Sequence, residues 1–310
     1  MKIYIAPMAG FTDYSYRKIL EPFNPDLLFT EMVNTHLLKT GDRNTMGMLK
    51  CDNKKITGTQ VYGWNREEII FSFLKLESLG FKNINLNMGC PQPKIIKSGA
   101  GAALLPNIDF IDRLLYELKG LLSPDTKISI KIRLGYKDFN SPEIYVKMAD
   151  KYNLDFICVH GRIQEQVYSG YSDWKKTASL SRIPRNIDFI GNGDLFHAEE
   201  IKDRISGSML DGIMLARGII GNPWLISQIR ELFNDGEIKT VPDFYTIKDT
   251  LIRHFNLLIE NKGVITASME INKFIKPYFR NLKSHSLMAK LTEIIIEKDA
   301  EKKMKEITGL

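Results

Sequence analysis

The chain has 310 residues, 44% of them hydrophobic, which is enough to bury the core of one large domain with a small addition. No apolar run reaches the roughly 18 residues that a membrane-spanning helix needs, and the short apolar start MKIYIAPMAG is not typical of a signal peptide. The net charge of +6 is compatible with a polyanionic partner, although the excess is spread along the chain.

The three cysteines, Cys51, Cys90 and Cys158, lie far apart in the chain. Their spacing matches no metal site, and an odd number of cysteines favours reduced thiols in a cytoplasm. We therefore expect a cytoplasmic protein that has no metal ion and does not associate with a membrane.

Short apolar segments alternate with helical patterns over the first three quarters of the chain. The strand candidates are Ile3–Ala6, Leu27–Glu31, Gly58–Tyr62, Ile84–Met88, Ile128–Ile132, Phe156–His160, Asp188–Gly191 and Gly212–Ala216. The helical patterns between them include Arg66–Leu79, Ile108–Leu121 and Pro142–Lys151. Eight strand–helix units predict an α/β fold, a closed (β/α)8 TIM barrel. Periodicity alone also allows an open doubly wound sheet, but no strand is followed by the G-x-G-x-x-G fingerprint of a Rossmann fold.

The pattern changes after about residue 233, where Asn234-Asp235-Gly236 and Pro242 predict a turn and a break. Three helical segments follow, near Ile247–Asn261, Ala267–Leu282 and Ser286–Ile307, and Pro277 should kink or split the second. We expect a barrel domain over residues 1–240 and an all-α helical bundle over residues 241–310.

Basic and aromatic residues are interleaved in the window from Lys273 to Lys290, which has no acidic residue. The basic residues are Lys273, Lys276, Arg280, Lys283 and Lys290, and the aromatic residues are Phe274, Tyr278 and Phe279. An ordinary solvated helix face would account for the charges alone. Cations for phosphates and rings for bases are also what a nucleic-acid surface needs.

The stretch Ile84–Leu105, INLNMGCPQPKIIKSGAGAALL, places a thiol at the rim of the predicted barrel. Cys90 stands between Gly89 and Pro91, just past the end of a strand, where the proline forces a turn. A buried structural cysteine is the commoner state of a free thiol. Buried cysteines usually lie inside apolar runs, so the Gly-Cys-Pro context favours a functional thiol.

The active site of a TIM barrel is built from the residues at the carboxyl ends of its strands. The residues predicted there are Pro7, Met8, Ala9, Gln60, Asn87, Cys90, Lys131, Arg133, His160, Gly161, Arg162, Asn192, Gly193, Asp194, Ala216, Arg217 and Gly218. The last two loops, GNGD and ARGIIGN, are glycine-rich, and phosphate sites of such barrels recur after strands seven and eight. Backbone N–H groups and an arginine can bind an anion there, so we expect a phosphorylated ligand.

Two strand-end residues allow more than one role. Lys131 could form a Schiff base or hold the electron-rich edge of a cofactor by its charge. His160 could be a general acid, a donor to a cofactor, or a histidine satisfied by its neighbours.

Taken together, these motifs resemble the tRNA-dihydrouridine synthases, flavin enzymes that reduce uridine in transfer RNA. The matching stretches are APMAGFTD (Ala6–Asp13), TEMVN (Thr30–Asn34), GTQVYG (Gly58–Gly63), INLNMGCP with KSGAGAALL (Ile84–Leu105), KIRLGY (Lys131–Tyr136), VHGR with EQVYSG and DW (Val159–Trp174), IGNGD (Ile190–Asp194) and DGIMLARGIIGNPWL (Asp211–Leu225). They cover most of the barrel in the family's order. The resemblance implies an FMN-binding barrel with a C-terminal helical domain.

The resemblance also implies roles for individual residues. Those implied to line the flavin ring or bond its edge are Pro7, Met8, Ala9, Gln60, Lys131 and His160. Those implied to hold the phosphate are Asn192, Gly193, Asp194, Ala216 and Arg217. The catalytic residue would be Cys90, and the residues implied to meet the substrate or RNA are Asn87, Arg162, Lys273, Lys276 and Arg280.

The implied reaction has two halves. NADPH reduces FMN, and a uridine is then flipped out of folded RNA into the pocket above the flavin. Hydride passes from flavin N5 to uracil C6, and Cys90 protonates C5. A thiol suits this step because its ordinary pKa lies above neutral pH, so it stays protonated.

Three other functions are compatible with parts of the sequence. A related FMN barrel acting on a small molecule, like dihydroorotate dehydrogenase, would share the phosphate loops and a cysteine but would not need the basic helical addition. An RNA-binding protein with a relict barrel would lack flavin, and a Schiff-base aldolase would use Lys131. For an enzyme that grips one large RNA we expect a monomer.

Overall fold

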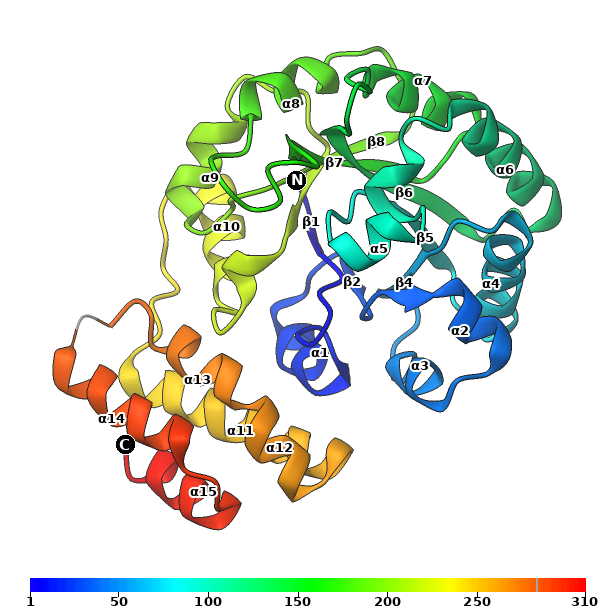
Figure 1. Ribbon diagram of the computed structural model, residues 1–310. Helices are drawn as coiled ribbons and strands as arrows, with labels where there is room; N and C mark the ends of the chain where they lie inside the picture. Colours follow the sequence, from blue (N-terminus) through cyan, green and yellow to red (C-terminus); the bar gives the residue numbers. More distant parts are fainter. Residues whose placement is uncertain (283) are drawn as a thin grey trace. The chain divides into compact units, whose positions relative to one another are not determined.

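The computed structural model describes residues 1–282 and 284–310, and its strands form one closed parallel barrel (Figure 1). The strands are β1 Lys2–Ile5, β2 Leu27–Phe29, β3 Val33–Asn34, β4 Thr57–Tyr62, β5 Asn83–Met88, β6 Lys127–Gly135, β7 Phe156–Ile163, β8 Asp188–Asn192 and β9 Gly212–Leu215. Their order is β2-β1-β9-β8-β7-β6-β5-β4-β3, and the pairing of β2 with β4 closes the ring. The predicted TIM barrel is confirmed, and each of the eight strand candidates overlaps an observed strand.

Helices alternate with the strands along the chain. They are α1 Tyr14–Leu20, α2 Thr35–Thr40, α3 Arg43–Met48, α4 Arg66–Ser78, α5 Pro93–Lys97, α6 Ile108–Leu121, α7 Glu143–Lys151, α8 Trp174–Ser181, α9 Ala198–Ile205 and α10 Leu225–Asn234. The three helical patterns predicted in this part match α4, α6 and α7 within a residue at each end. Among the described residues, none of the helices combines the length and apolarity that a membrane crossing requires.

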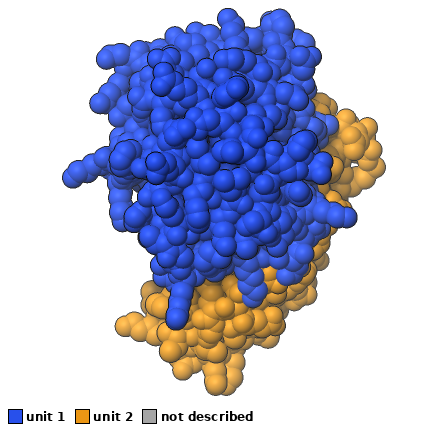
Figure 2. Space-filling model, turned by 90° about the vertical axis from the view of Figure 1, so that its right-hand side faces the viewer, with its two compact units in different colours: residues 1–10, 25–195, 203–216 blue, residues 11–24, 196–202, 217–310 orange. Residues whose placement is uncertain are grey.

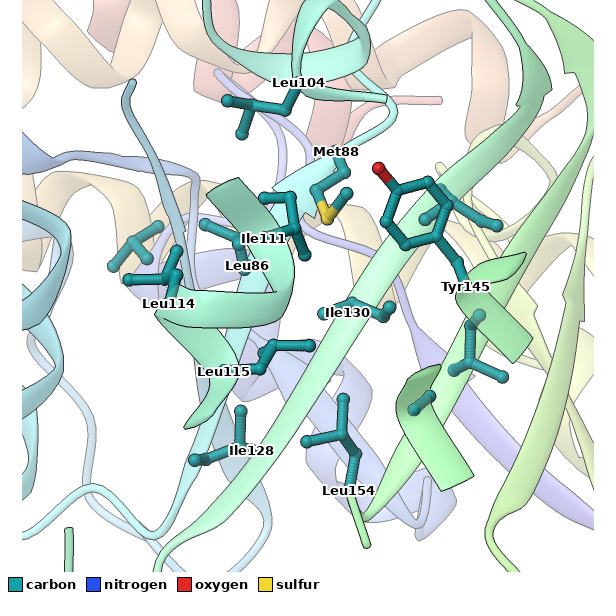
Figure 3. Packing of buried hydrophobic residues seen from close by; sticks show 14 of the residues in the cluster. Leu86, Met88, Leu104, Ile111, Leu114, Leu115, Ile128, Ile130, Tyr145 and Leu154 are labelled. Carbon is teal, nitrogen blue, oxygen red and sulfur yellow. The ribbon is translucent and has the colours of Figure 1, made fainter. Parts of the chain in front are cut away.

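The two faces of each strand carry different side chains, because successive residues of a strand point to opposite sides. In β5, Ile84, Leu86 and Met88 pack outward against α6 and its neighbours. Figure 3 shows Leu86, Ile128 and Ile130 facing Ile111, Leu114 and Leu115 of α6. The intervening Asn85 and Asn87 therefore face the barrel interior.

The interior of the barrel is filled at one level by apolar side chains and above it by polar ones. The apolar cluster contains Tyr4, Leu27, Phe29, Phe156, Cys158, Ile190 and Met214. Polar residues of β4 to β8 line the remaining part of the barrel interior and are also buried. They include Gln60, Asn85 and Ser129. This division closes the barrel at its centre and leaves a polar mouth at the carboxyl ends of the strands.

The chain packs into two compact units, which Figure 2 colours separately. The first comprises residues 1–10, 25–195 and 203–216 and holds the barrel strands; the second comprises residues 11–24, 196–202 and 217–310. Each compact unit combines segments that are separated along the chain, whereas the predicted domains are two continuous ranges. The domain boundary at residue 240 stays a prediction.

The described residues of the C-terminal region form five helices, where the sequence predicts three. They are α11 Phe244–Lys262, α12 Val264–Glu270, α13 Asn272–Tyr278, α14 His285–Ile296 and α15 Ala300–Thr308. The third predicted segment breaks because Glu297 is extended and the Asp299 side chain caps α15 by accepting from Lys302 N at 2.7 Å. The second breaks at Ile271, and α13 ends one residue after Pro277, which has no N–H to donate. Lys283 of the basic window lies outside the described residues.

His254 is the buried centre of the second unit. Its ring lies 4.5 Å from the ring of Phe274, 5.1 Å from Tyr16 and 6.0 Å from Tyr278, measured between centroids. Its Nδ1 is 3.2 Å from Tyr278 Oη. Burial disfavours the charged imidazolium and lowers the pKa of His254 to about 3.

The unfolding free energy should therefore decrease as the pH falls below about 6.5. The unfolded chain takes up a proton at its ordinary imidazole pKa, whereas the folded ring does not, so acid favours the unfolded state. His254→Phe, which cannot titrate, should show a smaller loss of melting temperature between pH 8 and pH 5 than the wild type. Equal losses would show that this ring does not account for the acid sensitivity.

Candidate active site

A chain of amides crosses three neighbouring strands at the barrel mouth. Gln60 Nε2 donates to Asn85 Oδ1 at 2.6 Å, and Asn85 Nδ2 donates to Ser129 Oγ at 2.8 Å. Parallel pairing puts Gln60 beside Asn85 and Asn85 beside Ser129, so the register itself builds this row. The backbone N–H groups of residues 89 and 90 donate to Asn87 Oδ1, so Asn87 Nδ2 is the donor to Gln60 Oε1 and Gln60 Nε2 is the donor to Asn85.

Asn87 joins this row to the turn that carries Cys90. Its Nδ2 donates to Gln60 Oε1 at 2.6 Å, and its Oδ1 accepts from Gly89 N at 3.1 Å and from Cys90 N at 2.9 Å. The structure therefore brings the predicted residues Gln60, Asn87 and Cys90 into one hydrogen-bonded group.

The Cys90 side chain is 8% exposed, at the inner end of its loop. The loop folds back so that Ala102 N donates to Cys90 O at 3.1 Å, and a Cβ at Gly101, where φ is 64°, would stand 2.7 Å from that oxygen. Burial raises the pKa of the Cys90 thiol, against the opposing effects of the Gln92 backbone N–H and of the charges on Arg133 and Lys131. The group is therefore a protonated thiol at neutral pH.

A second group gathers around Asn192 at the end of β8. Asn192 Nδ2 donates to Met214 O at 2.6 Å, which directs its Oδ1 towards Lys131 Nζ at 3.0 Å and His160 Nδ1 at 2.8 Å. An amide oxygen accepts only, so Nδ1 of His160 carries the proton. Burial, together with the charges of Lys131, Arg133 and Arg162, holds the pKa of His160 well below its usual value, so the ring is neutral.

Burial also lowers the pKa of Lys131. Within the described part of the chain its ammonium makes one hydrogen bond, to Asn192 Oδ1. Two of its N–H groups are therefore available to a ligand at the mouth.

Arg162 uses all five of its N–H donors inside the protein. Nε donates to Ser169 O, Nη1 to Ser172 Oγ and to His160 Nε2, and Nη2 to Gly170 O and to Asp194 Oδ2 at 2.6 Å. The guanidinium and the hydrogen bond from Ser172 N outweigh burial and lower the pKa of Asp194. Arg162 therefore holds the loop of residues 169–172. Its contact with flavin or RNA stays a prediction.

Gly193 lies in the chain between Asn192 and Asp194, and its φ is 122°. Its carbonyl accepts from Trp174 Nε1 at 3.0 Å, and a Cβ at this position would overlap the Ser172 hydroxyl. Only glycine fits the turn after β8. The Asp194 carboxylate accepts from Arg162, so Asp194 can bind an anion only through its backbone N–H.

The remaining predicted residues stand just after β1 and β9. In the first unit, Pro7 and Met8 are half-buried and Ala9 is exposed after β1, and Ala216 is half-buried after β9. In the second unit, the Arg217 guanidinium lies 5.6 Å from the centroid of the Phe196 ring.

The other basic residues predicted to meet RNA, Lys273, Lys276 and Arg280, lie in the second unit. Lys273 pairs with Glu270 and lies 5.4 Å from the Phe11 ring centroid. Lys276 is exposed, and so is Arg280, whose Nε donates to Pro277 O at 3.1 Å. Their contact with RNA stays a prediction.

Arg133, one of the predicted strand-end residues, also belongs to the site. It is 2% exposed and donates Nε to Gly89 O at 2.8 Å, Nη1 to Ile163 O at 2.9 Å and Nη2 to Val167 O at 2.8 Å. The signal was present in the alternation of β6, where Ser129, Lys131 and Arg133 share the interior face between outward isoleucines.

A closed parallel barrel whose mouth gathers amides, a buried ammonium and a protonated thiol defines an enzyme of the TIM-barrel class. The sequence profile of the dihydrouridine synthases (Dus) matches residues 4–308. The chain therefore belongs to the dihydrouridine synthase family.

Similar proteins from several bacteria carry the corresponding name. The chain is 30% identical to a "Probable tRNA-dihydrouridine synthase" of Rickettsia bellii, over 84% of this chain and 80% of that protein. It is 26% identical to the "tRNA-dihydrouridine synthase B" of Pasteurella multocida, over 91% of this chain and 84% of that protein.

Solved structures of lower similarity share the fold. Histamine dehydrogenase from Rhizobium sp. 4-9 superposes with a TM-score of 0.56 at 13% identity, over 83% of this chain and 49% of that one. A 2-naphthoyl-CoA reductase superposes with a TM-score of 0.57 at 10% identity, over 74% of this chain and 50% of that one. The chain thus spans about half the length of these two proteins, and the likeness is one of fold.

Proposed function

We propose that this chain is a monomeric tRNA-dihydrouridine synthase that uses FMN as cofactor and NADPH as reductant. Membership of the family supports the reaction, and the names of the relatives support tRNA as the substrate. The single observation that carries the proposal is the hydrogen-bonded group in which Asn87 links Gln60 to the Cys90 turn.

The donors at the mouth fit the polar edge of a flavin. Lys131 has two N–H groups available, and Gln60 Nε2 has one beyond its bond to Asn85. Ring nitrogens and carbonyl oxygens of a flavin accept such bonds, and an ammonium stabilises negative charge on the reduced ring. His160 is fixed as a neutral neighbour by Asn192 and Arg162, and Pro7, Met8 and Ala9 would line the ring.

We assign the phosphate to Asn192, Gly193 and Asp194 and to the consecutive residues Ala216 and Arg217. The turn at Gly193 presents backbone rather than side chain, which suits the approach of an anion. The guanidinium of Arg217 would add a charge-assisted bond.

The chain's own residues then handle the uracil. When bound, FMN would be the source of the hydride that uracil C6 receives. The Cys90 thiol donates its proton to C5, and Asn87 holds the turn that aims this thiol by accepting from two backbone N–H groups. The uridine has to leave its stack to reach a thiol that is 8% exposed. Lys273, Lys276 and Arg280 would meet the RNA backbone.

A reconstituted assay tests this function. The purified chain with FMN and NADPH should oxidise NADPH in the presence of unmodified tRNA, and the tRNA mass should rise by the mass of two hydrogen atoms for each uridine reduced. Free uracil and orotate, which both carry a C5–C6 double bond that can be reduced, serve as the small-molecule comparison. Turnover of either of them without tRNA modification would contradict the proposal, and so would purified protein that binds no flavin.

A further inference from the structure

One tryptophan is exposed in the barrel unit. Trp64 is 58% exposed, whereas Trp174 is 9% and Trp224 6% exposed. Trp64 lies two residues beyond the end of β4 and directly before Asn65, the N-cap of α4. It therefore stands at the carboxyl end of a strand, the edge of the barrel that carries the active site.

The base of the Trp64 side chain lies beside Gly99, in the loop that carries Cys90. A Cβ at Gly99 would stand 3.5 Å from Trp64 Cβ and 3.7 Å from its Cγ, which is ordinary van der Waals contact. The same loop is tied to Cys90 by the bond from Ala102 N to Cys90 O. β4 and β5 are neighbours in the barrel, with Val61 paired to Leu86, so the two loops leave adjacent strands.

The Cys90 loop is also basic. Residues 83–108 contain Lys94 and Lys97 and no acidic residue. Both lysines lie on α5 and are exposed. Four residues after Trp64 along the chain, the Glu68 carboxylate is 2.8 Å from His36 Nδ1.

We propose that Trp64, Lys94 and Lys97 form an RNA-contacting surface beside the reacting uridine, which rests on the proposed function. The indole of a tryptophan that is 58% exposed is a platform on which an unpaired base can stack. The ammonium groups can reach the phosphates of the same strand. Stacking on an aromatic ring tolerates any base, so this surface would add affinity for the unstacked nucleotides without selecting their identity.

The first experiment measures tRNA binding by the full chain with its flavin. Trp64→Ala should weaken tRNA binding by roughly tenfold and raise KM with little change in kcat, because the lost contact is made in both ground and transition states. Trp64→Phe, which keeps a ring, should lose less. The matched control is Tyr116→Ala on the outer helix α6, where Tyr116 is 71% exposed, and it should bind as the wild type does.

Fluorescence reports on the indole directly. Acrylamide should quench Trp64 in the free protein, and tRNA should protect it, while Trp64→Phe should show no tRNA-dependent protection. Lys94→Gln and Lys97→Gln should each reduce the salt slope of binding by about 1, whereas Lys147→Gln on α7 should leave it unchanged.

Two outcomes separate this inference from the proposed function. If the wild type reduces tRNA but Trp64→Ala matches it in affinity and KM, the surface is wrong and the function stands. If the wild type binds flavin yet reduces no tRNA, the proposed function fails. Unprotected Trp64 fluorescence at saturating tRNA would also overturn the surface.

Discussion

Cys90→Ala is expected to lower the rate of dihydrouridine formation by roughly 10²–10⁴-fold, the usual contribution of a general acid. The variant should still bind FMN, because Gln60 is held through the Asn87 side chain and the thiol takes no part in that bond. The Asn87 side chain contacts the backbone of residue 90, so the turn should survive the substitution. The measurement is dihydrouridine per tRNA under single-turnover conditions, with flavin absorbance as a check on the site.

Cys158→Ala is the matched control, because Cys158 is a second buried thiol of the same barrel, in its apolar interior. It should retain turnover. The pH profile gives a separate test: burial raises the pKa of the Cys90 thiol from the ordinary 9.0, and only the protonated form can donate. Turnover should stay level through neutral pH and fall only in alkali. Normal turnover by Cys90→Ala would rule out the acid role.

Arg133→Met should reduce turnover by roughly 100-fold, the cost of a small misplacement of a reacting group. The change leaves the carbonyls of Gly89, Ile163 and Val167 without their guanidinium partner, so the turn before Cys90 and the loop after β7 lose their common anchor. We expect the effect in kcat more than in KM, because a misplaced thiol affects the chemical step.

Arg133→Lys separates position from charge. It keeps the positive charge that lowers the thiol pKa but cannot bond three carbonyls at once. The turnover of Arg133→Lys should therefore be low but should fall with rising pH over the same range as that of the wild type. The turnover of Arg133→Met should fall at higher pH. Arg17→Met, in which another 2% exposed arginine is lost from the second unit, should lower stability without moving this pH range. The same pH range for Arg133→Met and the wild type would contradict the electrostatic part.

Local pattern was sufficient for the barrel. Ile108–Leu121 was predicted to the residue because its apolar positions recur at helical spacing, and the eight strand candidates emerged because each is a short apolar run closed by a break. The two-residue strand β3 and the splits of the C-terminal helices were missed, since a two-residue strand has no period to detect and a cap such as Asp299 depends on one side-chain bond.

The site divides in the same way. That Gln60, Asn87 and Lys131 stand at strand ends follows from their places in the strands, and the Gly-Cys-Pro turn marks Cys90. The contacts among them depend on register: Asn87 meets Gln60, 27 residues away, and Lys131 meets Asn192, 61 residues away. The motif HGR predicts Arg162 as a contact for flavin or RNA. It does not indicate which acceptors surround the guanidinium.

The amino-acid sequence by itself determined the barrel, the strand ends and the kinds of chemical group that stand there, because strand and helix periods are local and the carboxyl ends of parallel strands share one edge. Only the tertiary structure decided that Arg133 spans two loops, that Arg162 turns to Asp194, and that Trp64 lies on the Cys90 loop. Those contacts join residues far apart in the chain, and a donor's choice among many acceptors is made by packing and burial after the ring has closed.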